Sequence, residues 1–247
     1  MKVTVPAGFV IEYEDEKHKY RLNGDPVVSV TTALGVLDKS GPLMWWAWKM
    51  GIGDAFDWAH KFSKFDDLEA YLKANKLHPN AKRDKAADRG VGAHYALEQL
   101  ATTGRFDLSK VEPEDQGYAS GVMDWWLGAE PTECVVEQMV GSRKHGFAGR
   151  YDLDCVIDGA RTLVDLKTSK GIYESHMLQL EMYGIAAAES GYGKFENKLV
   201  LRAAPDGTFE EARSYATVGQ ALAVLGAYKA MQQLKKSKPK KSRKAAA

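Results

Sequence analysis

The sequence predicts an α/β fold, in which a β-sheet is flanked by helices and the N-terminal portion is partly helical. Three observations lead to this prediction. Segment 146–170 has the pattern of two antiparallel strands around Asp158-Gly159, a dipeptide suited to the positive φ angles of a type I′ turn. Helical patterns lie on both sides of it, at 80–103 and 172–191. Strand-like segments then follow the second of these helices.

Composition is that of an ordinary soluble globular protein. The 247 residues are 45% hydrophobic and 27% charged, which is enough for one large domain or two small ones. No run of about 18 apolar residues is present, and the N-terminus lacks the apolar region of a signal peptide, so we expect a cytoplasmic protein. Residues 1–234 contain no repeat and no Pro-, Gly- or Ser-rich linker, so a single domain is expected.

Charge is distributed unevenly along the chain. The formal net charge is +1, but residues 235–247 hold seven Lys and Arg residues and no acid, which leaves −6 for residues 1–234. An acidic body argues against a broad polyanion-binding surface, although a local groove or bound metal ions attract phosphate. We expect a disordered basic tail that adds salt-sensitive affinity for nucleic acid, with a merely solubilising end as the alternative. Its candidate DNA contacts are Lys235, Lys236, Lys238, Lys240, Lys241, Arg243 and Lys244.

The N-terminal segment 9–30 predicts a small β element with a turn at Asn23-Gly24. Ser29 or Thr31 is expected to cap the helix that follows. The amides at a helix N-terminus bind phosphate in some proteins and are simply capped in others, so both residues are candidate DNA contacts.

The next segment is helical and rich in aromatic residues. Packing in the core is the favoured role for its tryptophans, and a platform for stacking unpaired bases is the alternative. These residues are Trp45, Trp46, Trp48 and Trp58. A short helix is predicted at 63–80.

A long helix is predicted at 80–103, with a break or tight packing near Gly90 and Gly92. His94 and Glu98 are four residues apart and therefore lie on one face of this helix. The two glycines do not form a dinucleotide-binding loop, because a third glycine is missing and no strand precedes them.

A helix at 114–129 and a strand at 132–142, which includes Glu137, precede the hairpin. Cys134 and Cys155 are the only cysteines of the chain. Two thiols do not complete an iron–sulfur cluster or a structural zinc site, so we expect them to be small buried hydrophobic residues.

The second strand of the hairpin carries Asp165 and Lys167 on one face and Val164 and Leu166 on the other, because side chains alternate along a strand. Taken alone, this pattern is most simply an Asp–Lys pair on a solvated strand face.

The first strand carries Asp152 and Asp154, which are expected to share a face opposite Tyr151. The hairpin then brings Asp152 close to Asp165 and Lys167. Two carboxylates and an amine are costly inside a sheet core, where each charge must be paired. They are well suited to holding a divalent cation beside a polarised water.

In the helix at 172–191, His176, Gln179 and Tyr183 form one polar stripe. The stripe either faces solvent or faces a site, and its position directly after the hairpin favours a site. The remaining elements are strands at 196–203 and 208–216 and a closing helix at 218–234.

These motifs together resemble the PD-(D/E)xK nuclease superfamily, and within it the RecB-like and phage-type exonucleases. The matching motifs, in the order of the family, are G-x-x-x-H from Gly90 to His94, G-x-x-D from Gly149 to Asp152, D-x-K from Asp165 to Lys167, and Q-x-x-x-Y from Gln179 to Tyr183. Each motif is weak alone, but four in order with the expected elements between them are specific. The segment YRLNGDPVVSVTTAL also looks like the start of phage-type and mitochondrial-maintenance-type members, so the resemblance covers residues 18–203.

The resemblance implies a restriction-endonuclease-like core with a mixed β-sheet flanked by helices. It divides the domain into an N-terminal β and helical portion (1–80), a catalytic core (81–217) and a closing helix (218–234).

The resemblance also implies a metal site. Asp152, Asp165 and the backbone carbonyl of Leu166 would bind Mg²⁺ or Mn²⁺, and His94 would be a further ligand. Lys167 would orient or deprotonate the attacking water.

The family implies supporting roles for other residues. Gln179 and Tyr183 would position the scissile strand or brace the metal ligands, and His176 is a candidate DNA contact. Glu98 and Glu137 would lie just outside the metal ligands or help to bind a second ion. For Glu137, a structural ion pair is an equal alternative. Several RecB-like relatives carry a four-cysteine iron–sulfur cluster, which this chain has too few cysteines to hold.

We therefore expect a Mg²⁺- or Mn²⁺-dependent exonuclease that acts on single-stranded DNA or duplex ends, in recombination, repair or phage DNA processing. A structure- or sequence-specific endonuclease of the same fold and a catalytically inactive DNA-binding accessory protein are the alternatives. A single-strand annealing or recombination protein is the candidate protein partner, and no membrane partner is expected.

Overall fold

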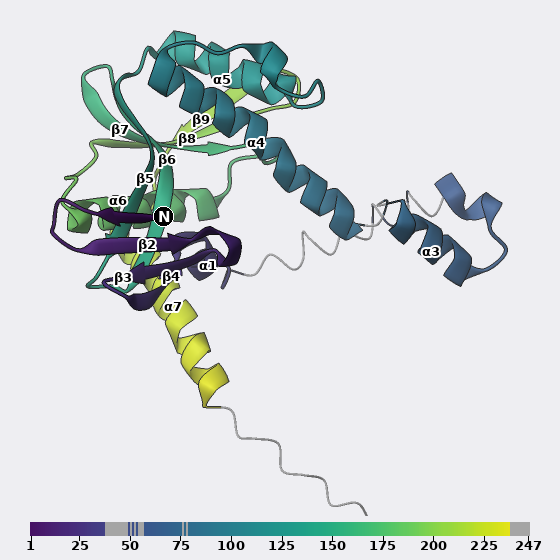
Figure 1. Cartoon of the computed structure of the whole chain (residues 1–247), viewed down its shortest axis with the longest axis horizontal. Helices are drawn as coiled ribbons and strands as arrows, with labels where there is room; N and C mark the ends of the chain where they lie inside the picture. The colour runs from purple at the N-terminus through teal and green to yellow at the C-terminus, as the bar shows by residue number, and fades with distance from the viewer. Residues whose placement is uncertain are drawn as a thin grey trace, which may run out of the picture.

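One mixed β-sheet, with helices on both faces, organises the chain (Figure 1). The computed structural model describes residues 1–37, 49, 51, 53, 57–75, 77 and 79–237. In this part of the chain, nine strands join in the order β1-β2-β3-β4-β6-β7-β8-β9, and β5 pairs with β6 beside that path.

The N-terminal strands form an antiparallel meander, as expected for the segment 9–30. Its members are β1 (Lys2–Thr4), β2 (Val10–Glu14), β3 (Lys19–Leu22) and β4 (Asp25–Ser29), with a 3-10 turn, η1 (Asp15–Lys17), after β2. The predicted turn at Asn23-Gly24 is present, and both residues have positive φ angles. The sequence patterns did not reveal the short β1.

The central strands confirm the predicted hairpin and the fold class. Strands β5 (Thr132–Ser142), β6 (Phe147–Ile157) and β7 (Ala160–Lys167) are antiparallel neighbours. Helix α6 (Glu174–Ser190) then crosses over, so that β8 (Asn197–Ala203) pairs with β7 in parallel, and β9 (Phe209–Arg213) follows antiparallel. Three antiparallel strands, a crossover helix and a parallel strand constitute a restriction-endonuclease-like core.

Helices cover both faces of the sheet. On one face, α4 (Pro79–Thr103) and α5 (Gln116–Ala129) pack over the core cluster that includes Leu97, Trp125 and Leu153. On the other face, α6, α1 (Val30–Leu34) and α7 (Val218–Lys236) pack over the cluster that includes Leu180 and Tyr183. The remaining helical segments are η2 (Ala59–Lys61), α3 (Phe65–Ala74) and η3 (Leu108–Lys110).

Helix α4 is continuous, so the glycines mark tight packing and not a break. A Cβ at Gly92 would lie 2.8 Å from Cγ1 of Val111, and one at Gly90 would lie 3.4 Å from Oγ1 of Thr168. The small residues therefore let this helix approach the end of β7 and the η3 segment closely.

The expected alternation along β6 is wrong at Tyr151, which packs with α6, whereas Leu153 and Cys155 pack under α4 and α5, opposite Asp154 as predicted. Tyr151 donates a hydrogen bond to Asp154 (Oη to Oδ2, 3.4 Å), and Asp154 pairs with Arg161 of β7, so Tyr151 and Asp154 lie on the same side. The physical reason is that β6 changes neighbours here. The residues of β6 that pair with β4 end at Ala148 and those that pair with β7 begin at Leu153, so the pleat between them is not held by a ladder on that edge.

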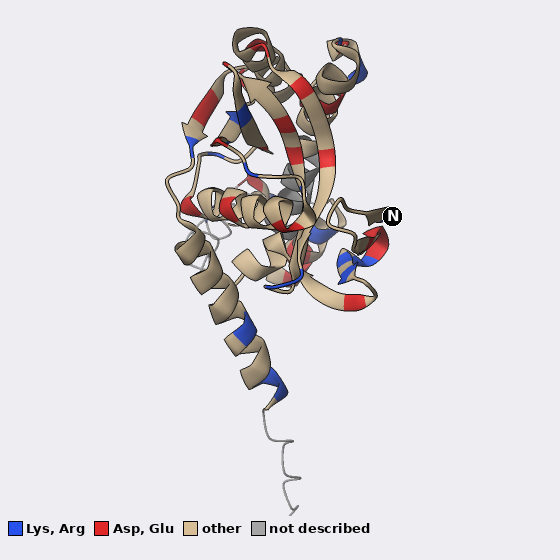
Figure 2. Cartoon of the chain, turned by 90° about the vertical axis from the view of Figure 1, so that its left-hand side faces the viewer, with Lys and Arg blue, Asp and Glu red and all other residues tan. Residues whose placement is uncertain are grey.

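Helix α7 extends to Lys236, so Lys235 and Lys236 belong to a helix and not to the start of a disordered tail. Figure 2 shows basic positions on the outer part of this helix and acidic positions on the strands. The other tail contacts, from Lys238 to Lys244, lie outside the described residues.

Of the predicted tryptophans, Trp45, Trp46 and Trp48 also lie outside the described residues. Trp58 packs against Tyr71 of α3, with 5.0 Å between ring centroids, which is a packing role. Cys155 is buried and Cys134 half-buried, and neither forms a disulfide. Among the described helices, none is both long and apolar enough to cross a bilayer.

Candidate active site

The gap in the β6 ladder is the centre of the candidate site. Strand β4 ends at Ser29 beside Ala148, and β7 approaches from the opposite direction and pairs from Leu153 onward. Residues 149–152 of β6 are therefore left without a ladder partner on this edge, and the C-terminal ends of β4 and β7 converge on it. The G-x-x-D motif occupies this gap.

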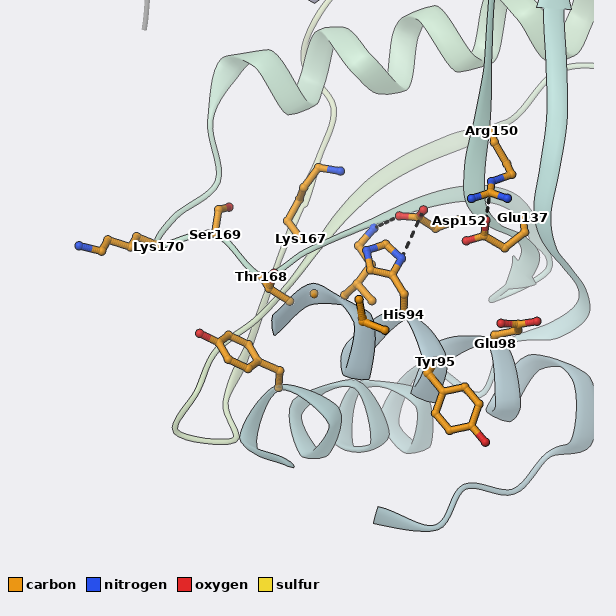
Figure 3. A pocket seen from close by; sticks show the side chains of 14 residues that line it. His94, Tyr95, Glu98, Glu137, Arg150, Asp152, Lys167, Thr168, Ser169 and Lys170 are labelled. Carbon is orange, nitrogen blue, oxygen red and sulfur yellow. Dashed lines mark hydrogen bonds and ion pairs between the residues drawn. The ribbon is translucent and has the colours of Figure 1, made fainter. Parts of the chain in front are cut away.

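Three groups able to bind a metal ion meet beside the gap. His94 of α4, Glu137 of β5 and Asp152 of β6 each offer one ligand atom, and these atoms lie within 4.8 Å of one another. Figure 3 shows the three side chains pointing toward one another from three elements. The carboxylate oxygens suit Mg²⁺ or Mn²⁺, whereas an imidazole is a more usual ligand of transition metals such as Zn²⁺ or Fe²⁺.

Asp152 is held in place by two contacts. Its Oδ2 accepts a hydrogen bond from the backbone N–H of Leu166 at 2.7 Å, and its Oδ1 lies 3.5 Å from Nδ1 of His94. The Asp152 carboxylate thus accepts a backbone hydrogen bond of β7 at the point where the β6–β7 ladder ends. This arrangement fixes the carboxylate with only 14% of the side chain exposed.

Glu137 reaches the same place from an unusual backbone conformation. Its φ angle is +53°, in the left-handed region that residues with a Cβ seldom adopt. Such a conformation costs about 1–3 kcal/mol, and strain of this kind concentrates at functional sites. The Glu137 carboxylate also forms a 2.6 Å ion pair with Arg150 (Nε to Oε2), so both interpretations offered by the sequence, ion pair and metal-site residue, are compatible with its position.

The buried Asp165 and the partly exposed Lys167 form an ion pair next to this trio. They share a face of β7, as predicted, and Lys167 Nζ lies 2.5 Å from Asp165 Oδ2. Burial raises the pKa of Asp165 to about 6; the ammonium of Lys167 opposes this shift and the charge of Asp152 adds to it. Burial lowers the pKa of Lys167, but Asp165 and Asp152 outweigh burial, so its pKa lies above the ordinary value.

The pair and the trio belong to one electrostatic cluster. Asp152 and His94 both shift the pKa of Asp165 through their charges. Asp165 therefore feels the charges of both other groups expected to share an ion, His94 and Asp152. Among the described residues, however, the three ligand atoms that lie within 4.8 Å of one another include Glu137 in place of Asp165.

Gln179 and Tyr183 of α6 face the sheet and not the solvent. Both are buried, and Nε2 of Gln179 donates to the Tyr183 hydroxyl at 2.9 Å. A Cβ at Gly149 would lie 2.6 Å from Cε1 of Tyr183, so the glycine of the G-x-x-D motif makes room for this ring. Burial raises the pKa of Tyr183 well above its ordinary value, so its phenol stays protonated.

An open cavity of about 1090 Å³ gives solvent access to the cluster. His94, Glu98, Glu137, Asp152, Leu166 and Lys167 line it, which includes both predicted outer glutamates. Its walls also include residues that the sequence patterns did not single out: Arg150, Tyr95, Thr168 and Lys170. Arg150 had a usable signal, since it lies two residues before Asp152 on the same strand.

A second, smaller cavity of about 210 Å³ adjoins the gap from the side of β4. Ser29, Thr31, Gly149, Arg150 and Tyr183 are among its lining residues. Ser29 caps α1 as predicted, because its Oγ accepts from the Thr32 amide at 3.1 Å. The structure therefore places the N-terminal hydroxyl groups next to the candidate site.

Two sets of predicted DNA contacts lie apart from these cavities. Nδ1 of His176 accepts a hydrogen bond from the Tyr173 amide at 3.2 Å, so this histidine takes part in capping α6. Lys235 and Lys236 lie in the last turn of α7, which points away from the sheet (Figure 1).

No protein-family model and no curated protein sequence matches this chain. Solved structures show limited similarity. An alkaline exonuclease, LHK-Exo from Laribacter hongkongensis, has 9% sequence identity and a TM-score of 0.36, over 59% of this chain and 79% of that one. The crystal structure of SSO0001 has 14% identity and a TM-score of 0.34, over 57% of this chain and 72% of that one. Similarity at this level says nothing about the activity of this chain.

Proposed function

We propose that the protein is a metal-dependent deoxyribonuclease, and specifically an exonuclease that hydrolyses phosphodiester bonds of DNA from an end. The observation that carries this proposal is the convergence of His94, Glu137 and Asp152 on an open cavity, which Lys167, the ion-pair partner of the buried Asp165, also lines. Carboxylates can hold a divalent cation that activates water, and a neighbouring ammonium can stabilise the charge that develops on a phosphate, so the group is suited to phosphodiester hydrolysis.

The donor set fits a divalent cation. His94, Glu137, Asp152 and Asp165 would hold it, and a bound Mg²⁺ or Mn²⁺ would lower the pKa of a water and neutralise charge on the phosphate oxygens. The backbone supports Leu166 as a further ligand. Its N–H points toward Asp152, and the N–H and C=O of one strand residue point to the same edge, so its carbonyl oxygen is directed to the same place.

Lys167 acts as a positive charge in this proposal. Without metal, the charges of Asp165 and Asp152 keep the pKa of Lys167 above its ordinary value, so the side chain is an ammonium at neutral pH. As an ammonium it would orient the attacking water and stabilise the negative charge that develops on the phosphate.

Gln179 and Tyr183 position neighbouring groups. The amide of Gln179 fixes the Tyr183 phenol at 2.9 Å, and the phenol, which stays protonated, can donate a hydrogen bond to a phosphate oxygen. Ser29 and Thr31 present hydroxyl groups to the adjoining cavity, where they would receive a backbone phosphate of the same strand.

The test is digestion of end-labelled single-stranded and duplex DNA with Mg²⁺ or Mn²⁺, with a circular single strand as control. Wild-type protein is expected to shorten both linear substrates from an end and to leave the circle intact. Asp165→Ala and Lys167→Ala are expected to abolish cleavage without loss of folding, because each removes a charge from the reacting centre.

Each other result would support a different function for this protein. Cleavage of the circle would replace the exonuclease by an endonuclease of the same fold. Absence of cleavage with either ion, in a folded protein that binds DNA, would support a DNA-binding accessory protein. Retained turnover in Lys167→Ala would refute the role of this residue.

A further inference from the structure

Tyr95 lies where the main cavity meets a neighbouring trough. It lines the 1090 Å³ cavity together with His94 and Glu98, and it also lines a separate hollow of about 350 Å³. The second hollow is bounded by Gln99, Thr103, Arg105, Phe106, Asp107 and Lys110. A strand that leaves the candidate metal site over α4 would therefore pass Tyr95 before it reaches the second hollow.

The ring of Tyr95 is exposed to solvent but packs against the ring of Phe106. The residue is 40% exposed, although its neighbours Ala93 and Ala96 on α4 are fully buried. Phe106 meets it edge to face, with 6.0 Å between ring centroids and an interplanar angle of 72°. Figure 3 shows that its hydroxyl points away from His94 and Asp152, so the side chain does not serve the metal cluster. An aromatic ring braced at its edge and open to solvent is suited to stacking.

Around this ring, α4 presents uncharged side chains along one line, and the exposed carboxylate of Glu98 lies on the side of the main cavity. Val91, Tyr95 and Gln99 follow one another at intervals of four residues, and Val91 is 68% exposed. Beyond them, Arg105 and Lys110 place two cations on the wall of the second hollow. The one acid there, Asp107, accepts hydrogen bonds from the backbone and side chain of Ser109, so its carboxylate is engaged in the η3 turn.

We infer that Tyr95 stacks against an unpaired base of the DNA strand that occupies the candidate site, and that Arg105 and Lys110 contact the phosphates of the nucleotides beyond it. This inference rests on the proposed nuclease function and adds a substrate class, single-stranded DNA. A base inside a duplex has both faces covered by its neighbours, and a terminal base pair has a free face only at the very end, so a ring set beyond the metal site is best matched by an unpaired base. Stacking on aromatic residues, followed by cationic contacts to the backbone, is a general mode of single-strand binding.

The test measures binding without cleavage. Oligonucleotides with a single 2-aminopurine, moved one position at a time from the end, are titrated with protein in Ca²⁺. Wild type and Tyr95→Phe are expected to quench the fluorescence at one position, because both side chains stack. Tyr95→Ala is expected to lose that quenching and to weaken binding by roughly 5- to 150-fold, the range measured for loss of one base–aromatic stack. Tyr215→Ala is the matched control, because Tyr215 is 69% exposed and lines neither cavity.

An abasic nucleotide at the quenched position completes the comparison. It should weaken binding of the wild type and have no further effect on Tyr95→Ala, since the same contact has already been removed. The double variant Arg105→Gln/Lys110→Gln should flatten the dependence of log K on log salt by about 1.4, for two single-strand phosphate contacts.

Equal binding of Tyr95→Ala and wild type, or quenching that Tyr95→Ala retains, would overturn the inference, as would an unchanged salt slope in the double variant. Cleavage of the end-labelled substrates by wild type in Mg²⁺ is scored separately. Loss of cleavage therefore reports on the nuclease proposal, and the Ca²⁺ titrations report on Tyr95.

Discussion

Replacing Asp152 by asparagine should remove metal binding and leave the fold intact. The amide has the shape of the carboxylate and keeps an oxygen that can accept the 2.7 Å hydrogen bond from the Leu166 amide. It lacks the charge that a divalent cation needs. The change therefore separates the structural contact of this residue from its electrostatic role.

The structure allows the size of the effect to be estimated. Without metal, the carboxylates of Asp152 and Glu137 repel each other, by about 3 kcal/mol for unit charges 4.8 Å apart at an effective dielectric constant of about 20. Arg150 offsets part of this repulsion through its 2.6 Å contact with Glu137. Asp152→Asn should thus be at least as stable as wild type in EDTA.

With metal, the two proteins should diverge. A cation at 100 times its Kd adds about 2.7 kcal/mol to the free energy of unfolding of the protein that binds it. For a chain of this size, about 2–4 °C per kcal/mol converts this to a rise in Tm of about 5–11 °C. Wild type should show this rise with Mn²⁺ or Mg²⁺, and Asp152→Asn should not.

The assay is a thermal melt across a metal titration. Asp158→Asn is the matched control, because it makes the same chemical change in the turn of the same hairpin, where asparagine tolerates the positive φ of 50°. The control should keep the full metal-dependent rise. A rise in Asp152→Asn equal to that of wild type would refute the placement of the cation at this cluster.

Three further predictions follow from the same contacts. Gly149→Ala should lower the free energy of unfolding, measured in urea, by about 1–3 kcal/mol, because its Cβ would lie 2.6 Å from the Tyr183 ring. Gly226→Ala is the control and should cause no such loss, because a Cβ there would have no atom within 4 Å. Equal effects of the two variants would contradict the predicted clash. Tyr183→Phe should lower kcat more than it changes KM, and an unchanged kcat would show that the phenol takes no part in the reaction. The same variant should lose about 1–3 kcal/mol of folding stability, because the buried amide of Gln179 loses its hydrogen-bond acceptor. In EDTA, Asp165 has a pKa of about 6 in the folded protein and of 3.8 in the unfolded chain. Wild type should therefore gain stability relative to Asp165→Asn as the pH falls from 7 toward 4, because the folded state takes up the proton first. A constant difference in Tm between the two proteins over that range would show that this pKa is not raised.

Local patterns were sufficient for much of the fold. The turn at Asp158-Gly159, the shared face of Asp165 and Lys167, and the cap at Ser29 each depend on residues that are close together in the sequence. The four-residue spacing of His94 and Glu98 likewise placed both on the wall of one cavity. Alternation and helical periodicity are short-range consequences of backbone geometry, so the sequence alone determined these features.

Alternation failed where long-range pairing changed. Tyr151 lies on the side of Asp154 and opposite Leu153, because β6 leaves β4 and meets β7 within a few residues. No local pattern indicates where a strand exchanges one neighbour for another.

The tertiary structure also decided the composition of the candidate site. It brought Glu137, with its left-handed backbone, into the group with His94 and Asp152, and it placed Ser29 beside Arg150 across the gap in the β6 ladder. These groups come from different elements, and their distances depend on strand register and helix packing. The sequence by itself therefore determined which residue types were available and most of the faces they occupy, whereas the meeting of His94, Glu137 and Asp152 at one place depended on the packing of α4, β5 and β6 against one another.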